Sequence, residues 1–88
     1  METESIILLY GTDWCFDCRR IRKILDSRQI QYTWINIDKD PEAAKKVEEI
    51  NAGNRSVPTI IFPDGSILVE PSDNEVKLIL DNLTGSNL

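Results

Sequence analysis

The chain has no histidine and only two cysteines among its 88 residues. Zinc takes four protein ligands, mostly cysteine and histidine, so a zinc site built from four cysteines would need two copies of the chain. Basic residues are also scarce, because ten lysines and arginines face fifteen aspartates and glutamates, for a net charge of −5. This balance argues against nucleic acid or an anionic membrane as a partner.

Long apolar runs are absent too. The run at residues 5–10 is too short for a signal-peptide core or a membrane span, and residues 1–4 are acidic where a signal peptide is basic. We therefore expect a cytoplasmic protein. In that reducing compartment a lone cysteine pair serves catalysis, redox sensing or metal binding more often than it forms a permanent crosslink. Without repeats or linkers, residues 1–88 are expected to form one domain and a monomer, with a polar tail at 84–88.

Cys15 and Cys18 lie three positions apart, between the apolar run and a basic, amphipathic stretch. That order predicts a strand, a short turn and a helix from about residue 15 to residue 28. The first turn of a helix has backbone N–H groups without helical partners, and these groups stabilise an anion. A thiolate at Cys15 would gain from that position, and Cys18 would face the same way one turn later. Cys18 could then attack a mixed disulfide formed at Cys15 and release the substrate thiol.

The remaining elements follow from apolar spacing and from turn and cap residues. Strands are predicted at residues 5–10, 31–37, 57–62 and 67–70, and helices at about 15–28, from Asp40-Pro41 to Gly53, and from the capping box Ser72–Glu75 onward. The inward stripes of the helices are Ile21, Ile24 and Leu25, then Ala43, Ala44, Val47 and Ile50, then Val76, Ile79, Leu80 and Leu83. A helix between the first two strands makes them parallel, and a turn at residues 63–66 makes the last two an antiparallel hairpin. We expect an α/β protein of order β-α-β-α-β-β-α, in which a four-stranded mixed sheet is flanked by three helices.

Val57-Pro58-Thr59 is the second feature that points to chemistry. Pro58 has no N–H to give to a strand ladder, which leaves the neighbouring backbone free for another partner. An extended substrate could pair with that edge beside Cys15. From the residues alone, the peptide bond before Pro58 is more often trans.

Taken together, these segments resemble the glutaredoxin-like redoxins of the thioredoxin fold, and the mycoredoxin branch in particular. The segments that carry the resemblance are residues 10–18, 38–44, 54–59, 64–66 and 71–72. A Cys-x-x-Cys alone is a weak signal, but with Val-Pro-Thr about forty residues later in a matching β/α order it is a strong one. The likeness extends from about Ile6 to Leu80.

The resemblance implies a role for each site residue. Cys15 would be the nucleophile, Cys18 the resolving thiol and Pro58 a cis-proline beside them. A low-molecular-weight thiol, of glutathione or mycothiol type, would lie along the Val57 backbone with its carboxylate near the start of the last helix. The contacts expected for that thiol are Trp14, Arg55, Val57, Ser72 and Asp73. Ser72 is first a helix cap, and Arg55 could equally be a solvated loop residue.

The sequence departs from the family pattern at three places. Glutaredoxins usually carry Pro-Tyr between the cysteines and mycoredoxins Gly-Tyr, whereas this chain has Phe16-Asp17. Thr12 replaces a common lysine, and Glu70-Pro71 replaces a Gly-Gly pair. Asp17, with Asp13 as the other option, is a candidate for taking the proton of the resolving thiol. A solvated charge at a helix start is the simpler interpretation of Asp17.

We therefore expect a thiol–disulfide oxidoreductase of glutaredoxin type, which reduces protein disulfides or mixed disulfides between a protein and a small thiol. It needs no bound cofactor or metal. The small thiol acts as a co-substrate, and a flavoprotein disulfide reductase could restore the dithiol. One alternative is a thioredoxin-like reductase without a small-thiol site, and another is a non-catalytic redox sensor or zinc-bridged dimer. The basic run from Arg19 to Lys23 is either a solvated helix face or a partner site.

Overall fold

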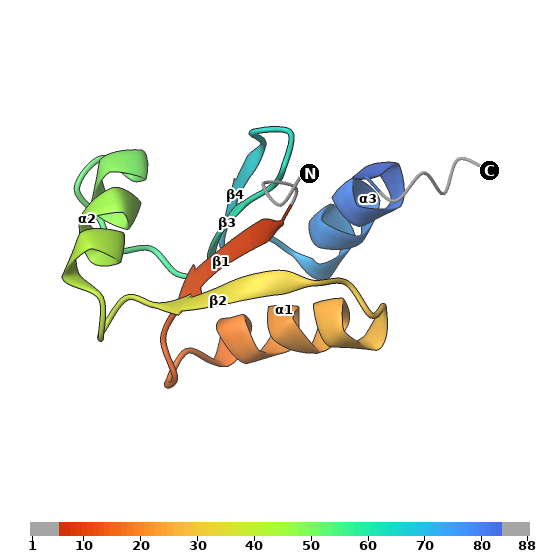
Figure 1. Ribbon diagram of the computed structural model, residues 1–88, viewed down its shortest axis with the longest axis horizontal. Helices are drawn as coiled ribbons and strands as arrows, with labels where there is room; N and C mark the ends of the chain where they lie inside the picture. The colour runs from red at the N-terminus through yellow and green to blue at the C-terminus, as the bar shows by residue number, and fades with distance from the viewer. Residues whose placement is uncertain (1–5, 84–88) are drawn as a thin grey trace.

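The computed structural model describes residues 6–83, which form the seven elements in the order expected from the sequence (Figure 1). They are β1 (Ile7–Gly11), α1 (Phe16–Ser27), β2 (Tyr32–Asn36), α2 (Pro41–Ile50), β3 (Thr59–Ile61), β4 (Ile67–Val69) and α3 (Asp73–Leu83). The predicted strand start at Ser5, the polar tail from Thr84 and the side chain of Leu83 lie outside the described residues. None of the helices within residues 6–83 is long and apolar enough to cross a membrane.

The four strands form one mixed sheet in the order β2-β1-β3-β4. β1 is central, parallel to β2 and antiparallel to β3, so that Leu9 lies between Trp34 and Ile60. A central strand is covered on both faces, which explains why the sequence of β1 is apolar without alternation. The parallel first half and the antiparallel β3–β4 hairpin are therefore confirmed.

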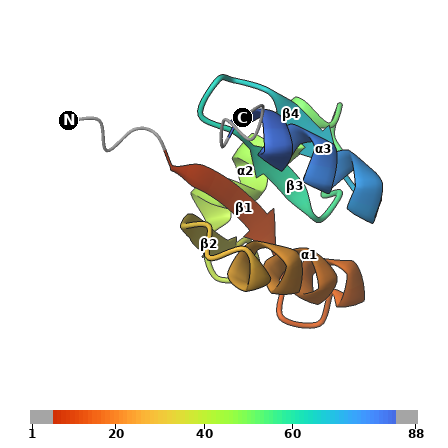
Figure 2. The same cartoon turned by 90° about the vertical axis from the view of Figure 1, so that its right-hand side faces the viewer.

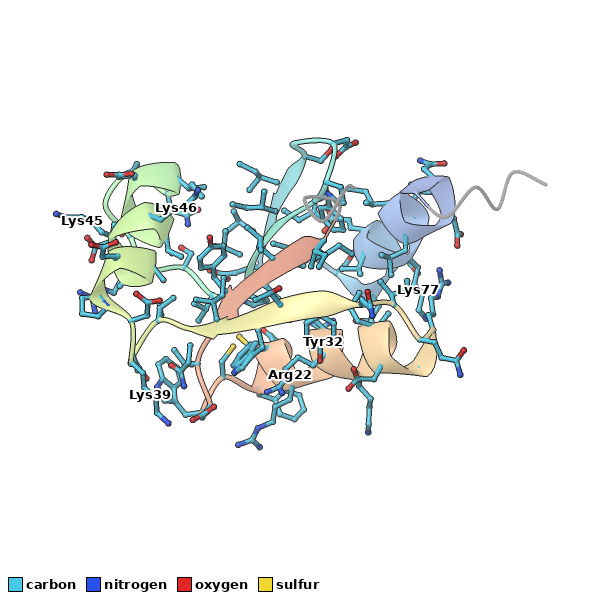
Figure 3. All side chains as sticks on the ribbon, in the orientation of Figure 1. Arg22, Tyr32, Lys39, Lys45, Lys46 and Lys77 are labelled. Carbon is cyan, nitrogen blue, oxygen red and sulfur yellow. The ribbon has the colours of Figure 1, made fainter. Side chains whose placement is uncertain are left out.

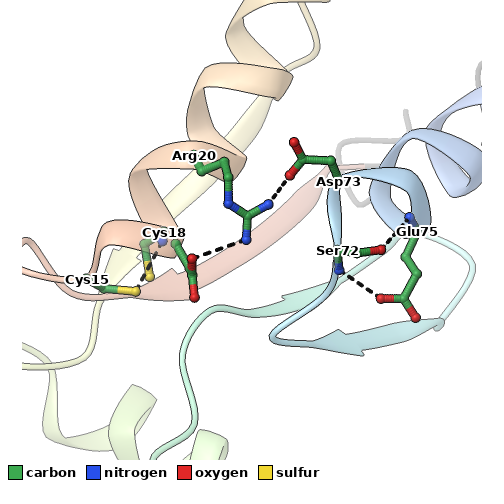
Figure 4. A network of polar contacts seen from close by, with 7 residues as sticks. Cys15, Cys18, Arg20, Ser72, Asp73 and Glu75 are labelled. Carbon is green, nitrogen blue, oxygen red and sulfur yellow. Dashed lines mark hydrogen bonds and ion pairs between the residues drawn. The ribbon is translucent and has the colours of Figure 1, made fainter.

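The helices cover both faces of the sheet. α1 and α3 contact each other on one face, over the buried cluster Ile7, Leu9, Ile21, Leu25, Ile60, Phe62, Val76 and Leu80 (Figure 2). α2 packs on the other face through Ala43, Ala44 and Val47, against Tyr10 and Ile37. The described residues of the predicted inward stripes are thus buried or half-buried, and an ion pair between Arg20 and Asp73 links the N-terminal halves of α1 and α3 (Figure 4).

The helix ends follow the cap residues. The Asp40 carboxylate accepts the Ala43 N–H at 3.1 Å, which starts α2. At its other end, both Ala52, with φ 55°, and Gly53, with φ 96°, have positive φ, and the Gly53 N–H donates to the Glu48 carbonyl at 2.7 Å. This Schellman arrangement stops α2 one residue earlier than a glycine in the left-handed cap position would.

β3 and β4 are shorter than the sequence predicts. The predicted strand 57–62 is reduced to Thr59–Ile61, and Glu70 leaves the second strand with a positive φ of 48°. Single backbone bonds extend the pairing at both ends, from the Glu70 N–H to the Pro58 carbonyl at 2.8 Å and from the Phe62 N–H to the Ser66 carbonyl at 2.8 Å. The proline cannot return a bond, so the ladder ends there.

Candidate active site

Cys15 is the N-cap of α1. Its backbone is extended, with φ −80° and ψ 112°, and its Sγ accepts the Cys18 N–H at 3.1 Å. An N-cap side chain is normally an oxygen that satisfies one of the free N–H groups of the first turn. Here the sulfur of Cys15 takes that place, where the helix dipole stabilises negative charge. The residue as a whole is only 7% exposed.

Cys18 lies behind Cys15 and is fully buried, with 0% exposure. Burial, together with a hydrogen bond to Cys15, raises the pKa of the Cys18 thiol to about 12, while the Thr12 backbone acts in the opposite direction. The nearby charge of Asp17 raises the same pKa further. Both cysteines are free thiols. The pair is therefore asymmetric: Cys15 stands at the anion-stabilising helix end, and Cys18 holds its proton.

Gly11 forms the floor beneath Cys18, a role that the sequence analysis missed. A Cβ built on this glycine would lie 2.5 Å from the Cys18 Sγ and 2.8 Å from the Trp34 Cη2. Real Cβ atoms do not approach other atoms that closely, so no larger residue fits without displacing the thiol or the indole. The signal available in the sequence was a glycine at the end of a buried strand, which often marks a close approach.

Gly11→Ala is expected to destabilise the reduced protein by about 1–3 kcal/mol, because overpacking forces the thiol and the ring to move. The measurement is the free energy of unfolding in urea under reducing conditions. The matched background is Cys18→Ala, where the closest clashing atom is gone. A cost that is equally large in both backgrounds would contradict the contact between Gly11 and the thiol as the cause.

Pro58 lies beside Gly11, under the cysteine pair. Tyr10 pairs with Thr59 in the β1–β3 register, so continuing that register brings Pro58 next to Gly11 and hence next to the cysteine pair. The Val57–Pro58 bond is cis, as the resemblance implied. Among the described residues, neither the N–H nor the C=O of Val57 has a hydrogen-bond partner. The expected free backbone edge is therefore present.

Arg20 connects the two helix starts, and the sequence analysis did not single it out. Its guanidinium contacts Asp17 on α1 at 3.3 Å and forms a hydrogen-bonded ion pair with Asp73 on α3 (Figure 4). These bonds raise the pKa of Arg20, although partial burial opposes the rise. Asp17 is thus held in an ion pair near the cysteines, and the positive charge of Arg20 offsets the negative charge of Asp73.

Ser72 and Glu75 form the capping box that the sequence predicts at the start of α3. The Ser72 Oγ accepts the Glu75 N–H at 3.2 Å, and Glu75 in turn accepts the Ser72 N–H at 2.8 Å (Figure 4). The capping role of Ser72 is confirmed. Its role as a ligand for a small thiol stays a prediction.

The other predicted contact residues differ in where their side chains are held. Trp14 is 69% exposed and donates its indole N–H to Asp38 at 2.8 Å, which ties the ring to the segment between β2 and α2. Arg55 is exposed and bound to Glu48 of α2 at 2.6 Å, so its contact is with the helix on the other face of the sheet. The structure therefore brings together Cys15, Cys18, Asp17, Pro58 and Asp73, whereas the side chains of Trp14 and Arg55 are held by partners of their own, Asp38 and Glu48.

Within residues 6–83, no group of three or more histidine, cysteine, aspartate or glutamate side chains is arranged to hold a metal ion. Zinc requires four ligands, so a metal at the cysteine pair would take its other ligands from a second chain.

Known proteins share both the sequence pattern and the fold. The glutaredoxin family model matches residues 7–67. A Mycobacterium tuberculosis protein whose name provisionally assigns it to the glutaredoxins is 40% identical over 81 residues, which cover 92% of this chain and 96% of that protein. Mycoredoxin 1 of Corynebacterium glutamicum is 42% identical over 72 residues, or 82% of this chain and 89% of the relative. The crystal structure of a glutaredoxin from Archaeoglobus fulgidus has the same fold, with a TM-score of 0.74 at 23% identity over 86% of both chains. The chain belongs to the glutaredoxin family of redox proteins.

Proposed function

We propose that this protein is a cytoplasmic thiol–disulfide oxidoreductase of glutaredoxin type. Its substrates are protein disulfides, or mixed disulfides between a protein and a low-molecular-weight thiol. The observation that carries the proposal is the Cys15 Sγ at the head of α1, which accepts the Cys18 N–H at 3.1 Å while Cys18 lies fully buried behind it. Such a pair supports a nucleophile and a resolving thiol with separate roles.

The reaction proceeds in two exchanges. The Cys15 thiolate attacks one sulfur of the substrate disulfide, which forms a mixed disulfide at Cys15 and releases the other substrate sulfur as a thiolate. Cys18 then loses its proton and attacks the Cys15 sulfur, which releases the second substrate thiol and leaves a Cys15–Cys18 disulfide. Two electrons and two protons pass from the dithiol to the substrate. A low-molecular-weight thiol or a flavoprotein disulfide reductase returns them.

A small thiol can bind beside Cys15. The free N–H and C=O of Val57 can pair with an extended molecule as a short strand does. The start of α3 offers the positive end of a helix dipole to a carboxylate, and the ion pair with Arg20 offsets the charge of Asp73 there. Both glutathione and mycothiol are candidates for the Val57 edge, whereas only glutathione carries a carboxylate that the start of α3 could bind.

Cys18→Ser should trap the small thiol. With the resolving sulfur gone, the thiol stays attached to Cys15, so incubation with glutathione disulfide or mycothiol disulfide should add the mass of one thiol to the intact protein. Cys15→Ser is the matched control and should gain no mass. If neither disulfide forms an adduct while the wild type still reduces a protein disulfide, the thioredoxin-like alternative without a small-thiol site is correct instead.

A further inference from the structure

The outer face of α1 is cationic, although the chain as a whole is acidic. Phe16, Arg19, Arg20 and Lys23 recur at spacings of three and four, so they form one stripe along the helix. They line a surface cavity of about 390 Å³. The stripe begins one residue after Cys15, so anything bound in it lies beside the nucleophile.

The cavity continues between α1 and α3. Arg20 and Lys23 also line a second cavity of about 320 Å³, whose other walls include Arg28, the C-cap of α1, Lys77 on α3, and Asp73, the carboxylate that Arg20 pairs with. We call this continuous surface the α1 groove, defined by Phe16, Arg19, Arg20, Lys23, Arg28 and Lys77. At 1.5 Å per residue, the twelve-residue separation between the two ends of the groove spans roughly 18 Å, the length of about five extended residues.

The cations of the groove differ in whether a carboxylate faces them. Arg20 and Arg28 are paired, Arg28 with Asp81 at 2.7 Å. Lys23 and Lys77, by contrast, have no carboxylate within ion-pair distance in the part of the chain that the structure describes.

Arg19 completes the unpaired set. Its guanidinium donates to the backbone carbonyl of Asp13 at 3.0 Å, a contact that leaves its charge uncompensated. Within residues 6–83, Arg19, Lys23 and Lys77 therefore present free positive charge along a groove, on a chain whose net charge is −5.

We propose that the α1 groove binds an acidic segment of a client protein, next to the disulfide that the protein reduces. This inference rests on the proposed function, because it names the class of substrate for the same cysteines. Charge complementarity selects an acidic occupant, and the length of the groove selects a polypeptide rather than a single anion. Phe16, which is 76% exposed at the mouth of the groove, supplies an apolar contact beside Cys15. The rest of the chain is acidic and repels such a segment at long range. The cationic groove is therefore the surface on which the segment can dock.

The test compares two peptide disulfides that are identical except for three glutamates or three lysines beside the cystine. The charge reversal Lys23→Glu with Lys77→Glu changes the groove without touching the cysteines. Its control is Lys45→Glu with Lys46→Glu on α2, which alters the net charge by the same amount at the opposite end of the molecule (Figure 3). At low salt the wild type and the control should prefer the acidic peptide by about tenfold in kcat/KM. The groove variant should lose or reverse that preference.

Three outcomes would overturn the proposal. The first is a wild type without preference, and the second is an equal loss of preference in both double variants, which would reflect net charge alone. The third is a dimer that the groove substitutions dissociate, because a second copy would then be the occupant.

A second measurement separates the groove from the redox function. Turnover of a small uncharged disulfide should be the same in the wild type, the groove variant and the control variant. If the wild type does not turn over this disulfide, the proposed oxidoreductase activity is refuted, but the proposed binding in the groove is not. Binding of a cysteine-free acidic peptide, followed by fluorescence anisotropy, still reports on the groove in that case. Wild-type binding that weakens about tenfold in the groove variant and not in the control supports the proposal, and equal binding contradicts it.

Discussion

Cys15→Ser should abolish disulfide reduction, with a loss in kcat/KM on the order of 10³-fold or more, because a serine hydroxyl is not ionised near neutral pH and forms no mixed disulfide. Serine is nevertheless a good N-cap, so its oxygen can accept the Cys18 N–H that the sulfur accepts now. The variant should therefore remain folded, with an unfolding temperature close to that of the reduced wild type. The measurement is the rate of reduction of a protein mixed disulfide, with thermal unfolding recorded on the same samples.

Cys18→Ser is the matched variant, because it removes the other sulfur of the pair. It should keep part of the activity toward mixed disulfides with a small thiol, since a second small thiol can resolve the intermediate. It should lose activity toward disulfides within one protein, because without Cys18 this protein has no thiol to resolve the mixed disulfide at Cys15. If Cys15→Ser keeps most of the wild-type rate, the nucleophile is wrongly assigned.

The fold was predictable because local signals agreed with the tertiary structure. The unbroken apolar run around Leu9 is what a central strand needs, and β1 is central. Asp40 and Ser72 start α2 and α3 as the cap rules require. The cysteine spacing predicted one thiol at the head of a helix and the other one turn later on the same side, and the hydrogen bond from the Cys18 N–H to the Cys15 Sγ has that geometry.

The parts of the site that the sequence did not predict depend on contacts between segments that are distant in the chain. Arg20 and Asp73 are 53 residues apart in sequence, and no local pattern pairs them. Gly11 matters because of what lies above it: the pairing of β1 with β2 places the ring of Trp34 there, and the packing of α1 on the sheet places the thiol of Cys18 there. The strand ends were overestimated for a related reason: an apolar residue predicts burial more reliably than it predicts ladder hydrogen bonds.

The second large effect is expected at alkaline pH, where the buried Cys18 thiol makes folding depend on its proton. Burial raises the pKa of Cys18 in the folded protein from 9.0 to about 12. Between these two pH values an unfolded chain has released this proton and the folded protein still holds it. The free energy of unfolding therefore falls as pH rises from about 9 toward 12, by at most about 1.4 kcal/mol per pH unit for one group. Below pH 9 both states hold the proton, and the contribution is constant.

The slope, rather than the absolute stability, is the quantity to measure. Urea unfolding of the reduced protein at several pH values between 7 and about 10.5 should show stability that declines above pH 9, and Cys18→Ala should flatten this decline. Tyr10 also has a raised pKa, chiefly because it is buried and secondarily because of Asp40, so its ionisation adds a slope of the same sign. Tyr10→Phe measures the part of the pH slope that Tyr10 contributes. The double variant Tyr10→Phe with Cys18→Ala should remove both contributions to the slope. A Cys18→Ala protein that loses stability with pH as steeply as the wild type would mean that the folded protein does not hold the Cys18 proton, and the assignment of Cys18 as the protonated resolving thiol would fall with it.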